Sequence, residues 1–180
     1  LRIFLEQSPD RPVKIFTLLP PMVTLSPAAR SHYITREEAK KLLAADQIIG
    51  LGESYWQGAI LTSDDRILEL ILETRRAGKS VQGHAAGAMD RKLAAYGAAG
   101  ALSCHESIST DDVLSRLEMG FFVMIREGYI RRDLGIISSI AHELDTRRLG
   151  LITDGTSLEL LSEKGYFVDV IQKAVDLGLD

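Results

Sequence analysis

Acidic and histidine side chains recur in this sequence where short apolar runs end, and such side chains could bind a divalent metal and move protons. They are Glu53 after 48–52, His84 after 80–83, His105 and Glu106 after 101–104, and Asp154 after 149–153. Gaps of about 20 to 50 residues between them are too long for a single metal-binding loop. Successive strand–helix units would instead bring one side chain each to a common rim, as in the active site of a (β/α) barrel. Carboxylate and imidazole groups together suit a hard to borderline divalent ion.

Each of these residues, taken alone, also has an ordinary explanation. A loop histidine with a hydrogen-bond partner would account for His84, although its small neighbours leave room for a ligand. Glu53 fits a solvated carboxylate, and Asp154 fits the cap of a following helix as well as a metal ligand. The hypothesis of a metal site therefore rests on position, because four of the six expected strands end in a residue that can bind metal. At the C-terminal rim of a barrel, such residues indicate function more than stability.

The neighbours His105 and Glu106 would place a ligand beside a proton carrier. A water molecule activated by a metal needs a nearby base, so the pair is chemically useful. Adjacent residues on an ideal strand point to opposite faces of the sheet. The strand must therefore end near His105 if both side chains serve one site. Arg126 and Glu127, after the next apolar run, add a charged pair at the same rim.

Other residues that could do chemistry carry weaker hypotheses. Cys104 is expected to be a small core residue and not half of a thiol dyad with His105, because adjacent strand residues diverge. We expect His32 and His142 to be structural or solvated, His32 in a polar loop and His142 within a helix. The sequence has no Gly-x-Gly-x-x-Gly or P-loop pattern, so a nucleotide cofactor has no support.

The composition bounds the class of protein and its partners. The chain has 180 residues, 46% of them hydrophobic, which is enough for the core of one domain. Its net charge of −4 and scattered basic residues give no reason to expect nucleic acid as a partner, although a nucleobase as substrate stays open. No apolar run approaches the ~20 residues that span a bilayer. Cys104 is the only cysteine, so no internal disulfide can form, and a reducing, cytoplasmic location fits best.

Helix and strand signals alternate along the whole chain. The expected strands are the apolar segments 13–19, 47–53, 80–84, 101–105, 121–125 and 149–153. The expected helices are 35–44, 62–78, 90–98, 110–119, 134–144, 158–162 and 167–177. A capping box at Thr35 and Glu38 opens the first of these helices. The apolar face of the second is expected at Ile67, Leu68, Ile71 and Leu72.

Apolar strands separated by helices are typical of a parallel sheet covered on its outer face. We therefore predict an α/β fold, a partial (β/α)8 TIM barrel of the metal-dependent hydrolase type. A complete barrel has eight units and about 250 residues, against the six units expected here. Because the chain starts with Leu1 and not with methionine, we expect it to begin inside a longer protein. The expectation is a single catalytic-barrel fragment over residues 1–180, with the first two strands missing.

At these positions the sequence resembles the adenine deaminases of the amidohydrolase superfamily. The similar segments, in the same order and spacing, are Gly50-Leu51-Gly52-Glu53, Gly83-His84-Ala85, His105-Glu106-Ser107, 123–128, Thr153-Asp154, Gly165-Tyr166 and 173–178. The similarity runs from about Val13 to the C-terminus. It implies a metal-dependent hydrolase of purine metabolism.

The resemblance also implies a role for each residue of the rim. Glu53 would bridge two divalent ions, and His84 and His105 would be ligands. Asp154 would bind metal and take the proton of the nucleophilic water, while Glu106 would shuttle a proton to the purine ring. A metal-activated hydroxide would attack the amino-bearing carbon of adenine, leaving hypoxanthine and ammonia. The implied cofactor is a binuclear divalent metal centre of Mn²⁺ or Fe²⁺, with Zn²⁺ also allowed.

The sequence departs from the family pattern at several points. The family's small accessory domain and the His-x-His of its first barrel strand are absent from these 180 residues. Two metal ligands are then missing, so we expect the 180 residues alone to be inactive. Gly155 stands where many members have a second aspartate, Ala86 where a proline is usual, and Ser54-Tyr55-Trp56 differs from the common sequence. These changes bear on the substrate more than on the chemistry. For Tyr55 and Trp56, packing is favoured over stacking on a planar substrate.

Two other functions stay open at this point. A related amidohydrolase could act on another cyclic amidine or amide, and a non-catalytic barrel could use the same rim as a binding module without metal. The expected partner is a small-molecule purine substrate, with no nucleic acid and no membrane. The sequence gives neither the metal nor the oligomeric state, and a homo-oligomer is allowed.

Overall fold

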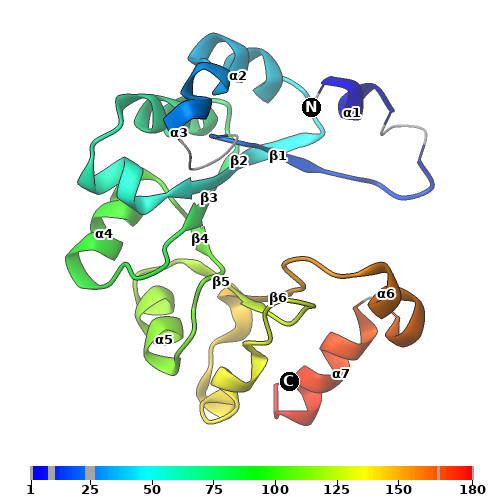
Figure 1. Ribbon diagram of the computed structural model, residues 1–180. Helices are drawn as coiled ribbons and strands as arrows, with labels where there is room; N and C mark the ends of the chain where they lie inside the picture. The colour runs from blue at the N-terminus through cyan, green and yellow to red at the C-terminus, as the bar shows by residue number, and fades with distance from the viewer. Residues whose placement is uncertain (1, 8–10, 23–26, 166, 180) are drawn as a thin grey trace. The chain divides into compact units, whose positions relative to one another are not determined.

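The computed structural model describes residues 2–7, 11–22, 27–165 and 167–179. Six strands in these ranges form a sheet whose hydrogen-bonded order follows the sequence, from β1 to β6 (Figure 1). The strands are β1 (Thr17–Leu19), β2 (Ile48–Tyr55), β3 (Ser80–His84), β4 (Ser103–Cys104), β5 (Phe122–Arg126) and β6 (Leu149–Ile152). The pairs β1–β2, β4–β5 and β5–β6 are parallel. Parallel strands in sequential order confirm the predicted α/β class.

Helical segments lie before the first strand, between strands and after the last strand. The α-helices are α1 (Arg2–Gln7), α2 (Arg36–Leu43), α3 (Asp65–Arg76), α4 (Asp90–Ala99), α5 (Thr110–Glu118), α6 (Leu158–Lys164) and α7 (Val168–Asp176). Shorter 3-10 or π segments are η1 (Pro27–His32), η2 (Gln57–Leu61), η3 (Leu134–Ile137), η4 (Ala141–Glu143) and η5 (Thr146–Arg148). The predicted capping box is present at the start of α2, where the Thr35 side chain accepts from the Glu38 N–H and Glu38 accepts from the Thr35 N–H.

Several predicted elements differ in length or type from the structure: the strand expected over 101–105 is only Ser103–Cys104, and two others differ as follows. The first strand was expected over 13–19, but only Thr17–Leu19 pairs with β2, and the apolar residues before it are exposed, so they gain no packing from the sheet. The helix expected over 134–144 is replaced by the 3-10 segments η3 and η4. Gly135 and two serines weaken an α-helix there. Leu134 and Ile137 are nonetheless buried, because a 3-10 helix also brings residues three apart to one face.

The buried face of α3 differs in part from the prediction. Ile67 and Ile71 are buried as expected, but Leu72 is 45% exposed and Leu70 is buried in its place. Glu73 is buried on the same face, where it accepts from Arg36 at 2.6 Å. A carboxylate thus occupies a position that the apolar pattern did not predict.

The chain forms two compact units. They are residues 1–83 with 98–101, and residues 84–97 with 102–180. In the first unit, α2 and α3 pack on each other and on β2 (Figure 1), and Leu51 and Ile67 are fully buried. In the second unit, α5 packs on β5, with Val113 and Val123 fully buried. Each unit therefore has an apolar core beneath the segments that carry the predicted site residues.

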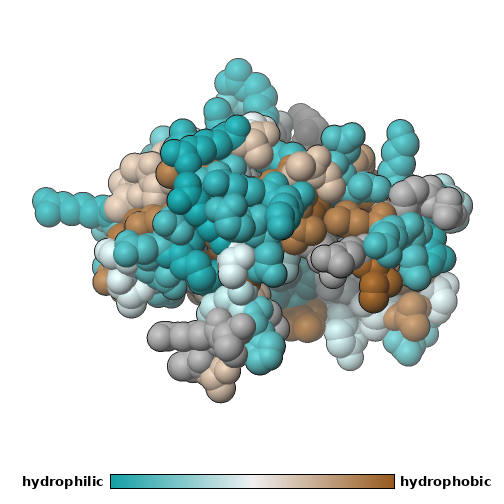
Figure 2. All heavy atoms as spheres, turned by 90° about the horizontal axis from the view of Figure 1, so that it is seen from above, coloured by the Kyte–Doolittle hydropathy of each residue, from teal (hydrophilic) through white to brown (hydrophobic). Residues whose placement is uncertain are grey.

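Some large apolar side chains remain on the surface among polar ones. Ile49, Leu102 and Phe122 are examples, and Figure 2 shows hydrophobic residues between hydrophilic ones on the face that it draws. Folded proteins keep much of their apolar surface in water, so single exposed side chains do not indicate a binding site. None of the helices in the described ranges is long and apolar enough to cross a membrane.

Gly50, three residues before Glu53, is a position where β2 tolerates no side chain. A Cβ added to Gly50 would lie 2.1 Å from the backbone oxygen of Ser80 in β3. We predict that Gly50→Ala lowers the free energy of unfolding by about 1–3 kcal/mol, the usual cost of overpacking, in urea titrations. Gly135→Ala is the matched control, because a Cβ there meets nothing within 4 Å. Equal free energies of unfolding for the two variants would contradict this prediction, because they would show that β2 and β3 can move apart without loss of stability.

Candidate metal centre

Three predicted rim residues of the second unit lie where strands end. His84 is the last residue of β3. β4 ends at Cys104, directly before His105 and Glu106, so this pair is not bound by the alternation of an ideal strand. The requirement that the strand ends near His105 is therefore met. Glu53 lies within β2, which continues to Tyr55, and so the expected strand end at Glu53 is two residues too early.

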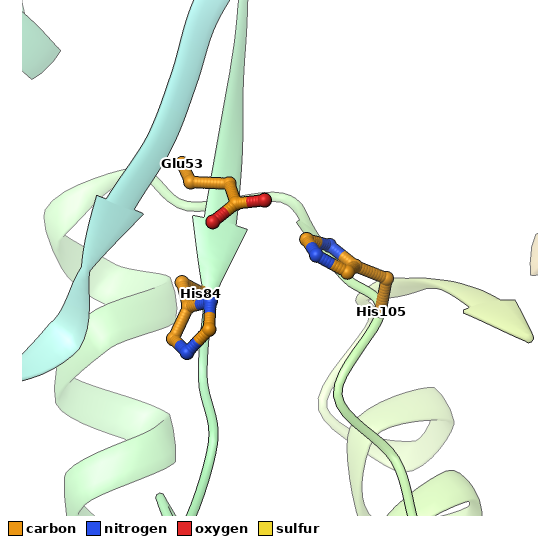
Figure 3. Close-up of side chains that lie close together, drawn as sticks. All are labelled: Glu53, His84 and His105. Carbon is orange, nitrogen blue, oxygen red and sulfur yellow. The ribbon is translucent and has the colours of Figure 1, made fainter. Parts of the chain in front are cut away.

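The imidazoles of His84 and His105 approach one carboxylate oxygen. His84 Nδ1 lies 3.0 Å and His105 Nε2 lies 2.7 Å from Oε1 of Glu106. The ring centroids are 6.0 Å apart and the rings are nearly perpendicular, at 84° (Figure 3). Side-chain exposure falls from 23% at His84 to 11% at His105 and 5% at Glu106. The cluster is therefore reached by solvent mainly from the His84 side.

The two oxygens of Glu106 have different surroundings. Oε2 accepts from the Ala85 N–H at 3.0 Å and from the Cys104 thiol at 3.3 Å. Oε1 is buried and receives no hydrogen bond of normal angle from the described residues, although both imidazoles approach it closely. A buried oxygen in that position requires a proton donor or a cation nearby. Oε1 is thus the oxygen that remains available to accept a proton.

The charge states around Glu106 follow from burial and from its neighbours. Burial raises the pKa of Glu106, but the contacts with His105 and His84 together lower it by more, so the pKa lies well below its usual value. Glu106 is therefore a carboxylate. Burial, and then the charge of Glu106, raise the pKa of Cys104. Cys104 thus stays a thiol whose S–H can donate.

A buried arginine holds the loop that follows β3. The side chain of Arg116 on α5 is fully buried. Its Nη2 donates to the Ala85 carbonyl at 2.9 Å and to the Ala88 carbonyl at 3.4 Å. Its Nε donates to Cys104 Sγ at 3.2 Å, and Nη1 forms an ion pair with Asp112 Oδ1 at 2.8 Å. One side chain therefore connects α5, the end of β4 and the loop after β3.

Asp154 lies two residues after β6 and has its own set of contacts. Its backbone has a positive φ of 48°, and its Oδ2 lies 3.5 Å from Nη1 of Arg126, the last residue of β5. Arg126 also donates from Nε to Asp133 Oδ2 at 2.8 Å. Glu127, the other half of the predicted charged pair, forms an ion pair with Lys173. The side chain of Asp154 is 33% exposed, so solvent and small molecules can reach it.

The residues with weaker hypotheses lie mostly as expected. Trp56 is 5% exposed and Cys104 is fully buried, so both pack in the interior. His32 and His142 are exposed, and His142 lies in the 3-10 segment η4, not in the predicted α-helix. Tyr166, part of the resemblance near the C-terminus, lies outside the described residues.

Sequence reasoning missed two residues that support the cluster. Tyr96 Oη accepts from the His84 N–H at 3.2 Å. Arg116 lies three residues after Val113 on the buried face of α5. A charged residue on the apolar face of a helix is a signal that could have found Arg116. Tyr96 gave no such signal, because an aromatic side chain is ordinary on a buried helix face.

No family model matches the chain. Similarity to individual proteins is clear: adenine deaminases from Oceanobacillus iheyensis and Moorella thermoacetica are 35% and 32% identical to it over its whole length. An adenine deaminase from Archaeoglobus fulgidus is 34% identical over 99% of the chain. The aligned part is 31% of each of these relatives, so the chain spans about a third of their length. From end to end, then, the chain is similar to part of the adenine deaminases, as its sequence motifs indicated.

Proposed function

We propose that the protein deaminates adenine to hypoxanthine and ammonia with the help of a divalent metal. The observation that carries the proposal is the cluster of His84, His105 and Glu106, in a chain similar to adenine deaminases over its whole length. Those relatives are about three times as long as this chain. The activity is therefore proposed for the full-length protein and not for these 180 residues alone. The proposed protein is an enzyme of purine metabolism that acts on a small-molecule substrate in the cytoplasm.

The proposed metal ligands are Glu53, His84, His105 and Asp154. His84 and His105 form a close group within one unit, with ring centroids 6.0 Å apart (Figure 3). Glu53 belongs to the other unit and Asp154 is outside that group, so both are assigned through the resemblance. Imidazole and carboxylate donors fit Mn²⁺, Fe²⁺ or Zn²⁺. The buried Oε1 of Glu106 beside both imidazoles also favours a cation there. The proposed centre is binuclear, and Glu53 would be among the residues that hold the two ions.

The chain's own residues account for the movement of protons. A divalent ion, when bound, supplies a Lewis acid that lowers the pKa of water. Glu106 receives a proton on Oε1, because Oε2 is fixed by two donors, and passes it to the purine ring. Water adds at the amino-bearing carbon, the C–N bond breaks and ammonia leaves. Asp154, held beside Arg126, accepts one proton of the attacking water and passes it to the leaving amino group, while the other water proton is the one that Glu106 carries to the ring.

Ammonia release from adenine, measured together with metal content, tests this function. We expect the full-length protein to hold Mn²⁺, Fe²⁺ or Zn²⁺ and to convert adenine to hypoxanthine. Removing the metal with a chelator should abolish turnover, and adding the ion back should restore it. A loaded protein that leaves adenine unchanged but releases ammonia from another cyclic amidine, or hydrolyses a cyclic amide, would favour the related hydrolase. Protein without metal at micromolar concentration would favour a binding module.

A further inference from the structure

The geometry points to Arg116 and Cys104 as positioning residues that hold Glu106 with Oε1 turned towards the two imidazoles. The inference rests on the proposed function, since it assigns Glu106 the role of proton carrier. Cys104 contacts Glu106 at Oε2, and Arg116 contacts Cys104 and Ala85. They act on Oε2 of Glu106 and on Ala85, the residue that follows His84.

The first step of the argument is that the guanidinium of Arg116 has no unused donor. Its five N–H groups serve the contacts to Cys104 Sγ, to the carbonyl and Oδ1 of Asp112, and to the carbonyls of Ala85 and Ala88, and Nη1 also lies 3.9 Å from Met89 Sδ. A fully buried charge is costly unless it is paired and hydrogen-bonded. With every donor used, Arg116 has one geometry and cannot turn without losing several bonds.

That geometry fixes the direction of the Cys104 hydrogen bond. Arg116 Nε can only donate, so Sγ is the acceptor of that bond at 3.2 Å. The thiol hydrogen then remains for Glu106 Oε2, 3.3 Å away. The sequence of donors is Arg116 to Cys104 to Glu106, and it needs the thiol, not the thiolate. A distance of 3.3 Å between Sγ and a carboxylate oxygen requires a hydrogen between them, since two acceptors would otherwise face each other.

Ala85 joins the same arrangement through its backbone. Its N–H donates to Glu106 Oε2 at 3.0 Å, and its carbonyl accepts from Arg116 at 2.9 Å. Oε2 is therefore held by a main-chain donor and a thiol donor at once. With Oε2 held by both, the carboxylate cannot exchange its oxygens, and Oε1 stays beside His84 and His105.

Steady-state kinetics of Cys104 variants in the full-length protein test this inference. We expect Cys104→Ala to lower kcat for adenine by about 10- to 100-fold, as loss of a supporting hydrogen bond does around metal sites. KM and metal content should stay unchanged, because Cys104 touches neither substrate nor ion. Cys104→Ser keeps a donor and an acceptor and should restore most of the rate. Arg116→Lys should lower kcat in the same range, since a single ammonium cannot satisfy all of these acceptors at once.

Thr74→Ala is the matched control for a lost buried hydrogen bond, because Thr74 Oγ1 donates to the Leu70 carbonyl at 2.7 Å in the other unit. It should lower stability without changing kcat. The inference is overturned if Cys104→Ala turns over adenine like the unchanged protein, or if Cys104→Ser is as slow as Cys104→Ala. Loss of rate that follows loss of metal would overturn it as well. Should Arg116→Lys fail to fold, the Cys104 pair decides.

An infrared measurement separates this inference from the proposed function. The S–H stretch of Cys104, identified by its loss in Cys104→Ser, reports the strength of its hydrogen bond. A charged acceptor makes the stronger bond, so Glu106→Gln should move the band to higher frequency. A band that does not move would overturn the inference even in an active enzyme. If the protein leaves adenine unchanged, the proposed function fails, and the band still decides whether Cys104 donates to Glu106.

Discussion

Glu106→Gln should lower kcat for adenine by about a hundred- to ten thousand-fold, the usual contribution of a group that transfers a proton in the rate-limiting step. The amide oxygen of glutamine can still accept from the Ala85 N–H and the Cys104 thiol, as Oε2 does now. The variant should therefore fold and bind metal normally. What it loses is the ability to take up a proton beside His84 and His105. Steady-state kinetics with metal analysis of the same sample measure both.

Glu118→Gln is the control for removing one carboxylate from the same unit. Glu118 is exposed at the end of α5, away from the contacts of Glu106. Its replacement should leave kcat unchanged. Should Glu106→Gln also keep its rate while binding metal, another group carries the proton, and the role assigned to Glu106 is wrong.

His105→Ala should cost the protein both its metal and its activity. Loss of a group that only supports a ligand lowers metal affinity by about 10–100-fold, so loss of a ligand itself should exceed that range. The side chain is mostly buried and lies against Glu106, so its removal also leaves the carboxylate with one imidazole. Chelator competition measures the affinity. The rise of Tm with added metal, present only when the folded state binds the ion, gives an independent value.

His142→Ala is the matched control, because His142 is an exposed histidine in η4 outside the candidate group. It should change neither metal affinity nor rate. A His105→Ala protein that binds Mn²⁺ as tightly as the unchanged protein would remove His105 from the ligands. His84→Ala should behave like His105→Ala, since both imidazoles approach the same oxygen.

The elements that the sequence predicted well are those with strong local signals. The capping box at Thr35 defines the start of α2, and Gly78, which has a φ of 71°, follows the end of α3. Both signals act through contacts within a few residues. The strand end at His105 also followed from a local requirement, that two neighbours serve one site. The prediction of an α-helix over 134–144 was wrong because the apolar spacing there fits a 3-10 helix as well as an α-helix. Only packing decides between the two.

In the candidate site, the residue types could be predicted from the sequence but their contacts could not. His84, His105 and Glu106 were found because their chemistry and their places at strand ends coincide. The orientation of Glu106 could not be predicted, because it depends through Cys104 and Ala85 on Arg116, which lies on a helix and binds backbone carbonyls. Contacts between a side chain and a distant backbone leave no periodic pattern in a sequence. The position of Asp154 beside Arg126 was hidden for the same reason.

Ala85 has a consequence for how this site can vary during evolution. Its two contacts, to Glu106 and to Arg116, are made by the N–H and the carbonyl of its main chain. Every residue except proline carries both groups, so substitutions other than proline at this position can remove neither contact directly. Its side chain is fully buried, so only size is restricted. A profile of residue types would record position 85 only as a small residue. It would not show that the main-chain N–H and carbonyl of this residue bind Glu106 and Arg116.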